Sequence, residues 1–173
     1  MSKNYSTSIL GIILVAIICR LSLETLEIDW SYTWSYLSLL TIVATYFGIY
    51  SQRQNSTESF DFMMDFKGAA QGGAFFALGY GIFTYIFYKI IHPHFLETFI
   101  ATRRQDILNS LSNSNESQET IQAATENFNS FAEMIYVPGN LAIITVTSLT
   151  FMSLFYALIF SLITKFLPKF VNQ

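Results

Sequence analysis

Four long apolar stretches alternate with polar segments along the chain. A helix needs about 20 mostly apolar residues to cross a bilayer. The stretches run from about Tyr5 to Leu26, Trp30 to Tyr50, Phe66 to Ile91 and Pro138 to Phe166. This pattern predicts an all-α integral membrane bundle of four transmembrane helices, forming a single membrane domain over residues 1–173.

The first stretch could also be read as a signal peptide, because Lys3 precedes it. A cleaved signal needs a site of small residues, and the residues that follow Cys19 are Arg20, Leu21 and Ser22. We therefore expect this stretch to remain as a membrane helix.

The segment from about residue 94 to 136 has a different pattern. On each side of the polar turn SNSNESQE (112–119), apolar residues have the spacing of one face of a helix. They are Leu96, Ile100, Ile107 and Leu111 before the turn, and Ile121, Ala124, Phe128, Phe131 and Ile135 after it. We interpret the segment as an extramembrane helical hairpin whose apolar faces close on each other. It could instead extend the third and fourth helices beyond the bilayer. Its faces could also lie on lipid, although their polar sides are acidic rather than rich in Lys.

The third apolar stretch begins KGAAQGGAFFALGYGIF (67–83), in which small residues lie four apart. Such spacing makes grooves that let helix backbones approach closely. The packing candidates are Gly68, Gly72, Gly73, Ala77 and Gly81. The grooves could serve packing within the bundle or a homo-oligomer, and the motif does not separate the two. Gln71 lies among these residues, and we expect its amide to face the interior toward Asn140 or a hydroxyl of the last helix.

The composition agrees with a membrane location. Hydrophobic residues make up 52% of the chain and charged residues only 12%, about half the charged fraction of a soluble domain. Aromatic residues make up 17%, and WSYTWSY (30–36) is typical of an aromatic belt at a membrane surface. We expect the lipid bilayer to be the main partner. We expect no nucleic acid, because the net charge is −3 and Arg103-Arg104 is the only adjacent basic pair.

The positive charges near the helix ends favour one orientation. With both termini inside, the inner side carries Lys3, Arg53, Lys67, Lys165 and Lys169, and the outer side carries Arg20, Lys89, Arg103 and Arg104. This weak excess predicts cytoplasmic termini and an external hairpin.

Candidate chemistry is sparse. His92 and His94 flank Pro93, but a transition-metal site needs three or four ligands, and the nearest carboxylate is Glu97. We read Pro93 as a helix end, and Pro138 as the matching start of the last helix. Arg20 lies near the end of the first stretch, and we expect it to snorkel to the interface and pair with Glu24. No catalytic, cofactor or metal motif is present in the sequence.

The chain resembles the bacterial membrane family of domain of unknown function 4199. The resemblance rests on the four apolar stretches, on FDFMMDFKGAAQGG (60–73), similar to the family pattern F-x-x-A-F-K-x-G, and on YKIIHPHFLE (88–97), similar to Y-x-x-I-N-P-D-F. It implies a fold and a location but no activity. His92 and His94 stand where the family typically has Asn and Asp, which argues against a shared histidine site.

These observations lead to two hypotheses and a weaker third. The first is a non-enzymatic integral membrane protein that acts as an interaction or accessory component, as a homo-oligomer or with a membrane protein partner. The alternative is a small transporter or channel subunit that works as an oligomer, supported by Gln71 and the hydroxyl-rich last helix. The third is an enzyme that uses His92, His94 and Glu97.

Overall fold

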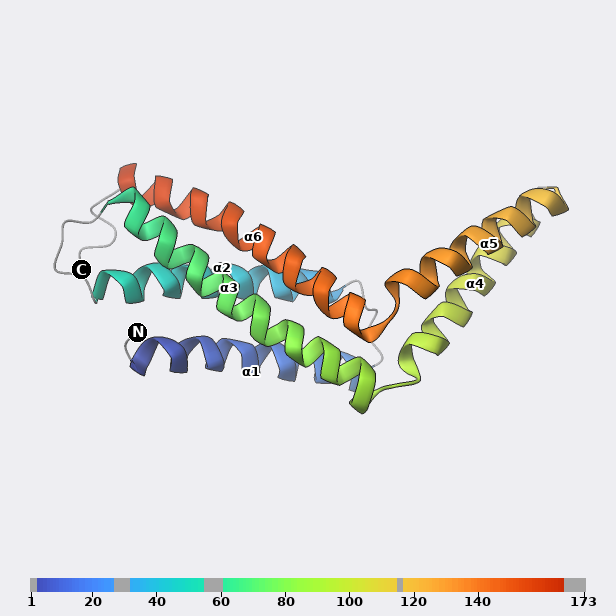
Figure 1. Cartoon of the computed structure of the whole chain (residues 1–173), viewed down its shortest axis with the longest axis horizontal. Coiled ribbons are helices and arrows are strands. Elements are labelled where there is room, and N and C mark those ends of the chain that lie inside the picture. The colour runs from blue at the N-terminus through green and yellow to red at the C-terminus, as the bar shows by residue number, and fades with distance from the viewer. Residues whose placement is uncertain (1–2, 27–31, 55–60, 115–116, 167–173) are drawn as a thin grey trace. The chain divides into compact units, whose positions relative to one another are not determined.

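The computed structural model describes residues 3–26, 32–54, 61–114 and 117–166 of the chain (Figure 1). These residues form an all-α fold, as the sequence predicts. The elements in chain order are α1 (Lys3–Thr25), α2 (Tyr32–Gln54), α3 (Phe62–Ile86), a π-helical turn (Phe87–Ile91), α4 (Phe95–Asn113), α5 (Gln118–Ile135) and α6 (Pro138–Phe166).

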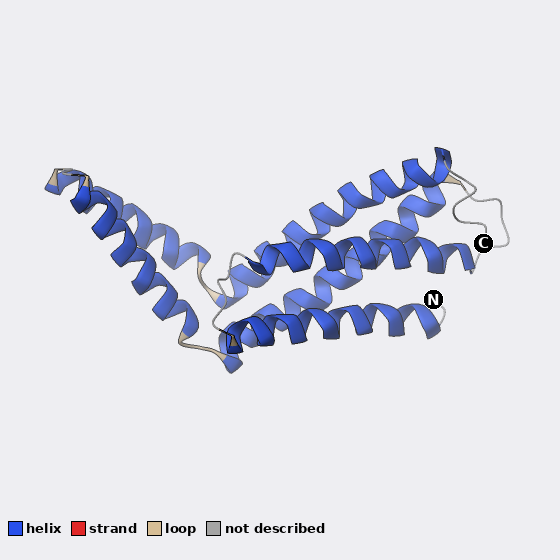
Figure 2. Ribbon diagram, turned by 180° about the vertical axis from the view of Figure 1, so that it is seen from behind, coloured by secondary structure: helices blue, strands red, loops and turns tan. Residues whose placement is uncertain are grey.

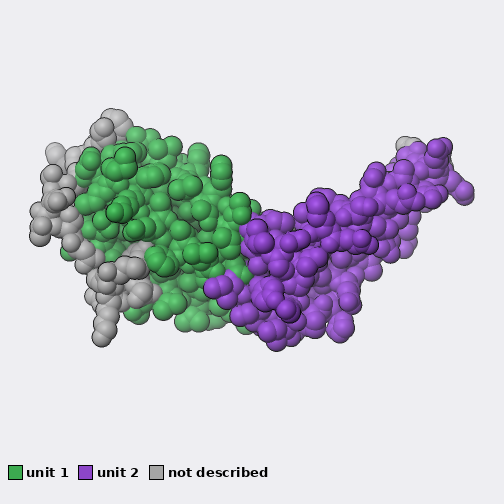
Figure 3. All heavy atoms as spheres, viewed as in Figure 1, with its two compact units in different colours: residues 1–81, 145–173 green, residues 82–144 purple. Residues whose placement is uncertain are grey.

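The chain divides into two compact units (Figure 3). Unit 1 contains residues 1–81 and 145–173, and unit 2 contains residues 82–144. The boundary passes through α3 and α6, so each of these helices contributes to both units.

Unit 1 is a bundle in which α1, α2 and parts of α3 and α6 lie side by side (Figures 1 and 2). The helices pack closely because glycine removes the side chain at their contacts. A Cβ added to Gly48 of α2 would overlap the backbone carbonyl of Gly68 of α3, and one added to Gly73 of α3 would overlap Ser153 of α6. Beside these contacts, Ile49, Ala69 and Ala157 form a buried apolar cluster of α2, α3 and α6.

Unit 2 contains the predicted hairpin, with α4 packed against α5. Its base is a buried cluster of Phe87, Tyr88, Leu96 and Leu141, to which Ile135 and Tyr136 add partly buried side chains. A π-turn closes α3 here, because the His92 N–H donates to the carbonyl of Phe87 five residues back (2.8 Å). This apolar base explains why the hairpin begins directly after Pro93.

Among the described residues, three helices are long and apolar enough to cross a membrane, and they suggest a membrane protein. They cover Thr7–Thr25, Phe62–Ile91 and Pro138–Thr164. The second expected span, Trp30–Tyr50, is helical over its described part, but the helix there, α2, is not among the three. The reason is its sequence, which intersperses tyrosine, threonine and serine with leucine and isoleucine. The third span also begins at Phe62, one turn before the expected Phe66.

Candidate functional site

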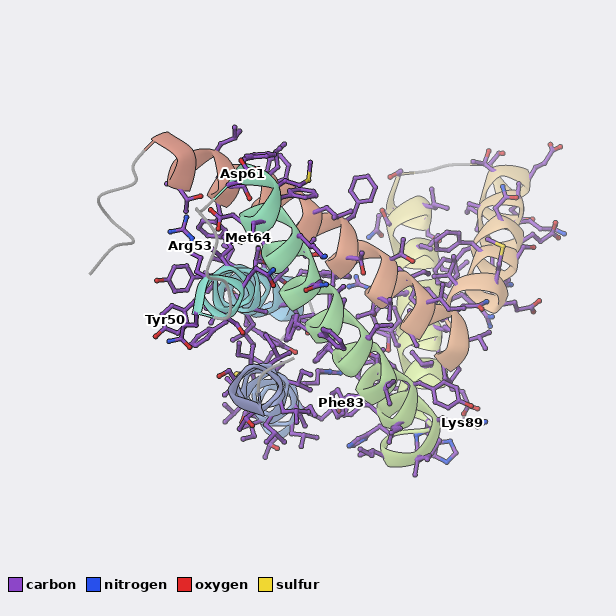
Figure 4. All side chains as sticks on the ribbon, turned by 60° about the vertical axis from the view of Figure 1, so that its left-hand side comes forward. Tyr50, Arg53, Asp61, Met64, Phe83 and Lys89 are labelled. Atoms are coloured by element: carbon purple, nitrogen blue, oxygen red, sulfur yellow. The ribbon has the colours of Figure 1, made fainter. Side chains whose placement is uncertain are left out.

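The most polar feature inside unit 1 is a cluster of Arg53, Asp65 and Thr164, which we call the polar clamp. Arg53, which is labelled in Figure 4, lies in the last turn of α2, and Asp65 lies in the first turn of α3. The guanidinium donates two hydrogen bonds to the carboxylate, from Nε to Oδ1 (2.8 Å) and from Nη2 to Oδ2 (2.6 Å). The Thr164 hydroxyl of α6 donates to the same Oδ2 (2.7 Å). The clamp therefore ties three helices together.

The clamp is buried, which increases the strength of its electrostatic interactions. The side chains of Arg53 and Asp65 are only 10% and 3% exposed. Removing two charges from water costs free energy that only close, well-aligned hydrogen bonds can offset. The planar guanidinium meets this requirement by binding both carboxylate oxygens at once. Both carboxylate oxygens are thus engaged in holding helices, and the arrangement is structural rather than reactive.

A second ion pair lies near the C-terminal end of α1. Arg20 and Glu24 are one helical turn apart, and their Nη2 and Oε2 atoms are 3.1 Å apart. The predicted pairing is present, but the snorkelling is wrong, because the Arg20 side chain is only 4% exposed. The carboxylate one turn away offsets the charge within the protein, so the guanidinium has no need to reach water.

Hydroxyl groups supply the other polar contacts between helices of unit 1. The hydroxyls of Tyr36 and Tyr80 are 2.7 Å apart, as are those of Ser38 and Tyr156. Thr41 and Thr45 instead donate to the carbonyls one turn back on their own helix. Such contacts satisfy polar groups where water is absent, and they link α2 to both α3 and α6.

The small residues of α3 face its neighbours in the bundle. Gly68 and Gly72 lie against the backbone of α2, and Gly73 lies against Ser153 of α6. Ala77 and Gly81 are buried as well. These contacts place the predicted grooves inside the chain itself, while a role in a homo-oligomer stays a prediction.

The interior position expected for Gln71 is wrong. Gln71 is exposed on α3, on the same face as the exposed residues Lys67, Phe75 and Leu78. Its neighbours in sequence explain this, because the small residues at 68, 69, 72 and 73 occupy the inward faces of the helix. Its expected partner Asn140 is also exposed, and it donates to the carbonyl of Met134 at the end of α5.

The two histidines lie where α3 ends and α4 begins. The ring of His92 packs on Phe87, with 5.3 Å between ring centroids, whereas His94 precedes the first turn of α4 and pairs with Glu97 (3.2 Å) on the surface. Within the described ranges, no group of three His, Cys, Asp or Glu side chains is placed to hold a metal ion. Pro93 lies in the turn between the histidines, and Pro138 is the first residue of α6.

The sequence reasoning missed the polar clamp. A signal was available, because Arg53 and Asp65 have opposite charges and lie at facing ends of two consecutive helices. Thr164 gives no such signal, since it lies 99 residues from Asp65.

Comparison with known proteins gives one match. A family model described as "Protein of unknown function (DUF4199)" matches residues 6–165. The chain belongs to this family. A search of curated proteins and a search of solved structures each found no match.

The DUF4199 match covers every helix described above except the first turn of α1 and the last residue of α6. It therefore includes the polar clamp, the glycine contacts and the hairpin in one family unit. The description of the DUF4199 family names no activity, so any function must be argued from the residues.

Proposed function

We propose that this DUF4199 protein is a non-enzymatic, multi-pass protein of a bacterial inner membrane that acts as an interaction or accessory component. In this proposal α1, α2, α3 and α6 cross the bilayer, both termini are cytoplasmic and the hairpin of α4 and α5 is external. The positive charges near the helix ends support this orientation.

The polar clamp is the observation that carries the proposal. A catalytic carboxylate or arginine needs atoms that are free to meet a substrate. Here both oxygens of Asp65 accept hydrogen bonds from other helices. The strongest polar group of the bundle thus maintains the packing, as expected of a protein that works through its surfaces.

The transporter alternative has less support in the structure than in the sequence. The transporter hypothesis requires Gln71 and the hydroxyls of α6 to line a common polar path for a substrate. Gln71 is exposed, and Ser153 packs against Gly73 while its hydroxyl donates to the Thr150 carbonyl of its own helix (2.8 Å). The residues expected to form a path therefore contribute to tight packing or to the outer surface.

A purification experiment tests the proposed function. The full chain is tagged, extracted from its own membranes in mild detergent and analysed by native mass spectrometry. We expect a foreign membrane protein bound at a fixed stoichiometry. A monomer or homo-oligomer that carries no such protein would contradict the accessory role and favour transport.

A matched variant locates the binding element. Glu119, Glu126 and Glu133 are exposed and seven residues apart on α5, so replacing all three with Gln removes charge from the hairpin without touching its packed face. Loss of the bound protein in this variant would place the interaction on the hairpin. Retention would place it on the bundle.

A further inference from the structure

The end of α5 and the bend that follows it carry an exposed apolar patch of Phe131, Met134 and Val137, which we call the α5 end patch. These side chains are 48%, 60% and 43% exposed, respectively. Ala132, between them in sequence, is buried, so the patch lies beside the face that packs on α4 rather than within it. Exposed apolar side chains that recur every three residues in this way are typical of a contact surface.

The charges of α5 lie on a different side of the helix. Glu133 is two residues from Phe131, which places it about 160° around the helix. Glu119 and Glu126 share the side of Glu133, because they precede it by fourteen and seven residues. No Lys or Arg occurs in α5. The three members of the α5 end patch therefore carry no charge, and the carboxylate nearest in sequence, Glu133, lies about 100° around the helix from Met134.

Contacts within unit 2 place the α5 end patch next to the end of α3. Ile135 and Tyr136, which lie between patch residues, pack on the cluster of Phe87, Tyr88 and Leu141. In the π-helical turn that follows α3, Lys89 (Figure 4) places its ammonium over the Tyr85 ring, 5.0 Å from the ring centroid, and donates to the Tyr85 hydroxyl (2.5 Å). A Lys and Tyr at the end of an apolar helix are typical anchors in the headgroup layer of a membrane.

The exposed apolar surface continues from the α5 end patch into a candidate span. Val137 directly precedes α6, whose apolar stretch covers Pro138–Thr164, and Ile143 in its second turn is 65% exposed. A surface that is continuous with a lipid-facing helix and lies near headgroup anchors fits the same partner. We propose that the α5 end patch lies in the lipid interface, so that the hairpin is immersed at its base rather than fully extramembrane. This inference rests on the proposed membrane location.

A second copy of the chain is a poorer occupant. Three exposed side chains offer far less area than a stable dimer needs, which is about 1,200–2,000 Å² in total. A lipid layer has no such minimum area. Because the patch lacks basic residues, it needs no anionic headgroup, and zwitterionic phosphatidylcholine should suffice.

Spin labelling of the full chain in phosphatidylcholine nanodiscs tests the inference. The chain has one cysteine, so single labels can be placed in a Cys19→Ala background. We compare three single-label variants. Met134→Cys places the label in the patch, and Gln122→Cys places it on the exposed side of α5. Phe151→Cys places it at the middle of the α6 span, where Phe151 is 76% exposed. The measured quantity is the accessibility of each label to oxygen, which enters lipid, relative to that of a water-soluble nickel complex.

We expect the oxygen-to-nickel ratio at Met134→Cys to be several-fold higher than at Gln122→Cys and to approach that at Phe151→Cys. A ratio at Met134→Cys equal to that at Gln122→Cys would overturn the inference, since the patch would then face water. Exclusion of both reagents at Met134→Cys would overturn it too, because protein rather than lipid would cover the patch. A low ratio at Phe151→Cys would instead show that the membrane location itself is wrong.

Discussion

At the scale of single residues, Asp65 is the side chain on which unit 1 depends most. It joins α3 to α2 through Arg53 and to α6 through Thr164. Removing one partner of a buried ion pair leaves the other charge uncompensated, which costs about 3–5 kcal/mol of stability. We expect Asp65→Asn to lower the thermal midpoint of the detergent-solubilised protein substantially.

A double variant separates the charge from the packing in this prediction. Arg53→Met combined with Asp65→Leu removes both charges and keeps apolar volume, so it should recover much of the stability lost in Asp65→Asn. Unchanged stability in Asp65→Asn would show that the ion pair does not hold the helices. Failure of the double variant alone would show that the hydrogen bonds matter more than the charge balance.

Two hydroxyls one turn apart on α6 should behave in opposite ways. Thr164 donates to Asp65, and Thr164→Val keeps its shape but removes that charged hydrogen bond, which costs about 1.5–3 kcal/mol. The buried hydroxyl oxygen of Ser161 has no hydrogen-bond partner in the described structure. Ser161→Ala should therefore be neutral or stabilising by up to about 1 kcal/mol. Chemical unfolding of both variants in the same detergent checks the contrast, and equal losses would refute it.

The sequence predicts a residue's environment only where its surroundings are local. The pairing of Arg20 with Glu24 follows from a spacing of four on one helix, and the structure contains it. The interior position expected for Gln71 was wrong because it depends on which side of α3 the neighbouring helices occupy. The polar clamp was not predicted for a similar reason, since Thr164, a partner of Asp65, comes from a distant part of the chain.

At the scale of elements, glycine decides how closely α2 and α3 approach. A Cβ at Gly48 would overlap the Gly68 carbonyl, and backbone cannot move away as a flexible side chain can. We expect Gly48→Ala to push the two helices apart and to cost about 1–3 kcal/mol of stability. Thermal unfolding in detergent measures this loss.

Gly11 supplies the matched control for this change. It lies within α1, and a Cβ there would meet nothing within 4 Å. Gly11→Ala should thus stabilise the helix by about 0.5–1 kcal/mol, because alanine has the higher helix propensity. If both variants had the same effect, the α2–α3 contact would not be the reason for the glycine at position 48.

The helices themselves are the part of the fold that periodicity predicts best. The long apolar stretches, together with the apolar residues spaced three and four apart in the segment 94–136, predict every described α-helix. The expected start of α3 at Phe66 is one turn too late, because the pairing of Asp65 with Arg53 lets the helix begin at Phe62. The π-turn at Phe87–Ile91 has no sequence signal of its own, and it depends on packing in the cluster of unit 2.

At the scale of the whole molecule, the direction of α2 bears on the number of spans. Three contacts pair α2 with α3 in antiparallel order, namely Tyr36 with Tyr80, Ala44 with Gly72, and Gly48 with Gly68. Gln52 extends the series, because it also lies against Gly68. From Tyr36 to Gln52 the helix rises about 24 Å, which is most of a hydrocarbon core of about 30 Å. We therefore predict that α2 crosses the membrane beside α3, despite its more polar sequence.

If α2 crosses the membrane, its two ends lie on opposite faces of the membrane. Leu26 precedes α2 and Gln54 ends it, and both side chains are exposed. In a Cys19→Ala background, Leu26→Cys and Gln54→Cys should react with a membrane-impermeant maleimide from opposite faces of the membrane. Gln122→Cys in the hairpin should react from the same face as Leu26→Cys, because α3 returns the chain to that side. Reaction of Leu26→Cys and Gln54→Cys from one face would leave α1, α3 and α6 as the spans and would place the two termini on opposite sides.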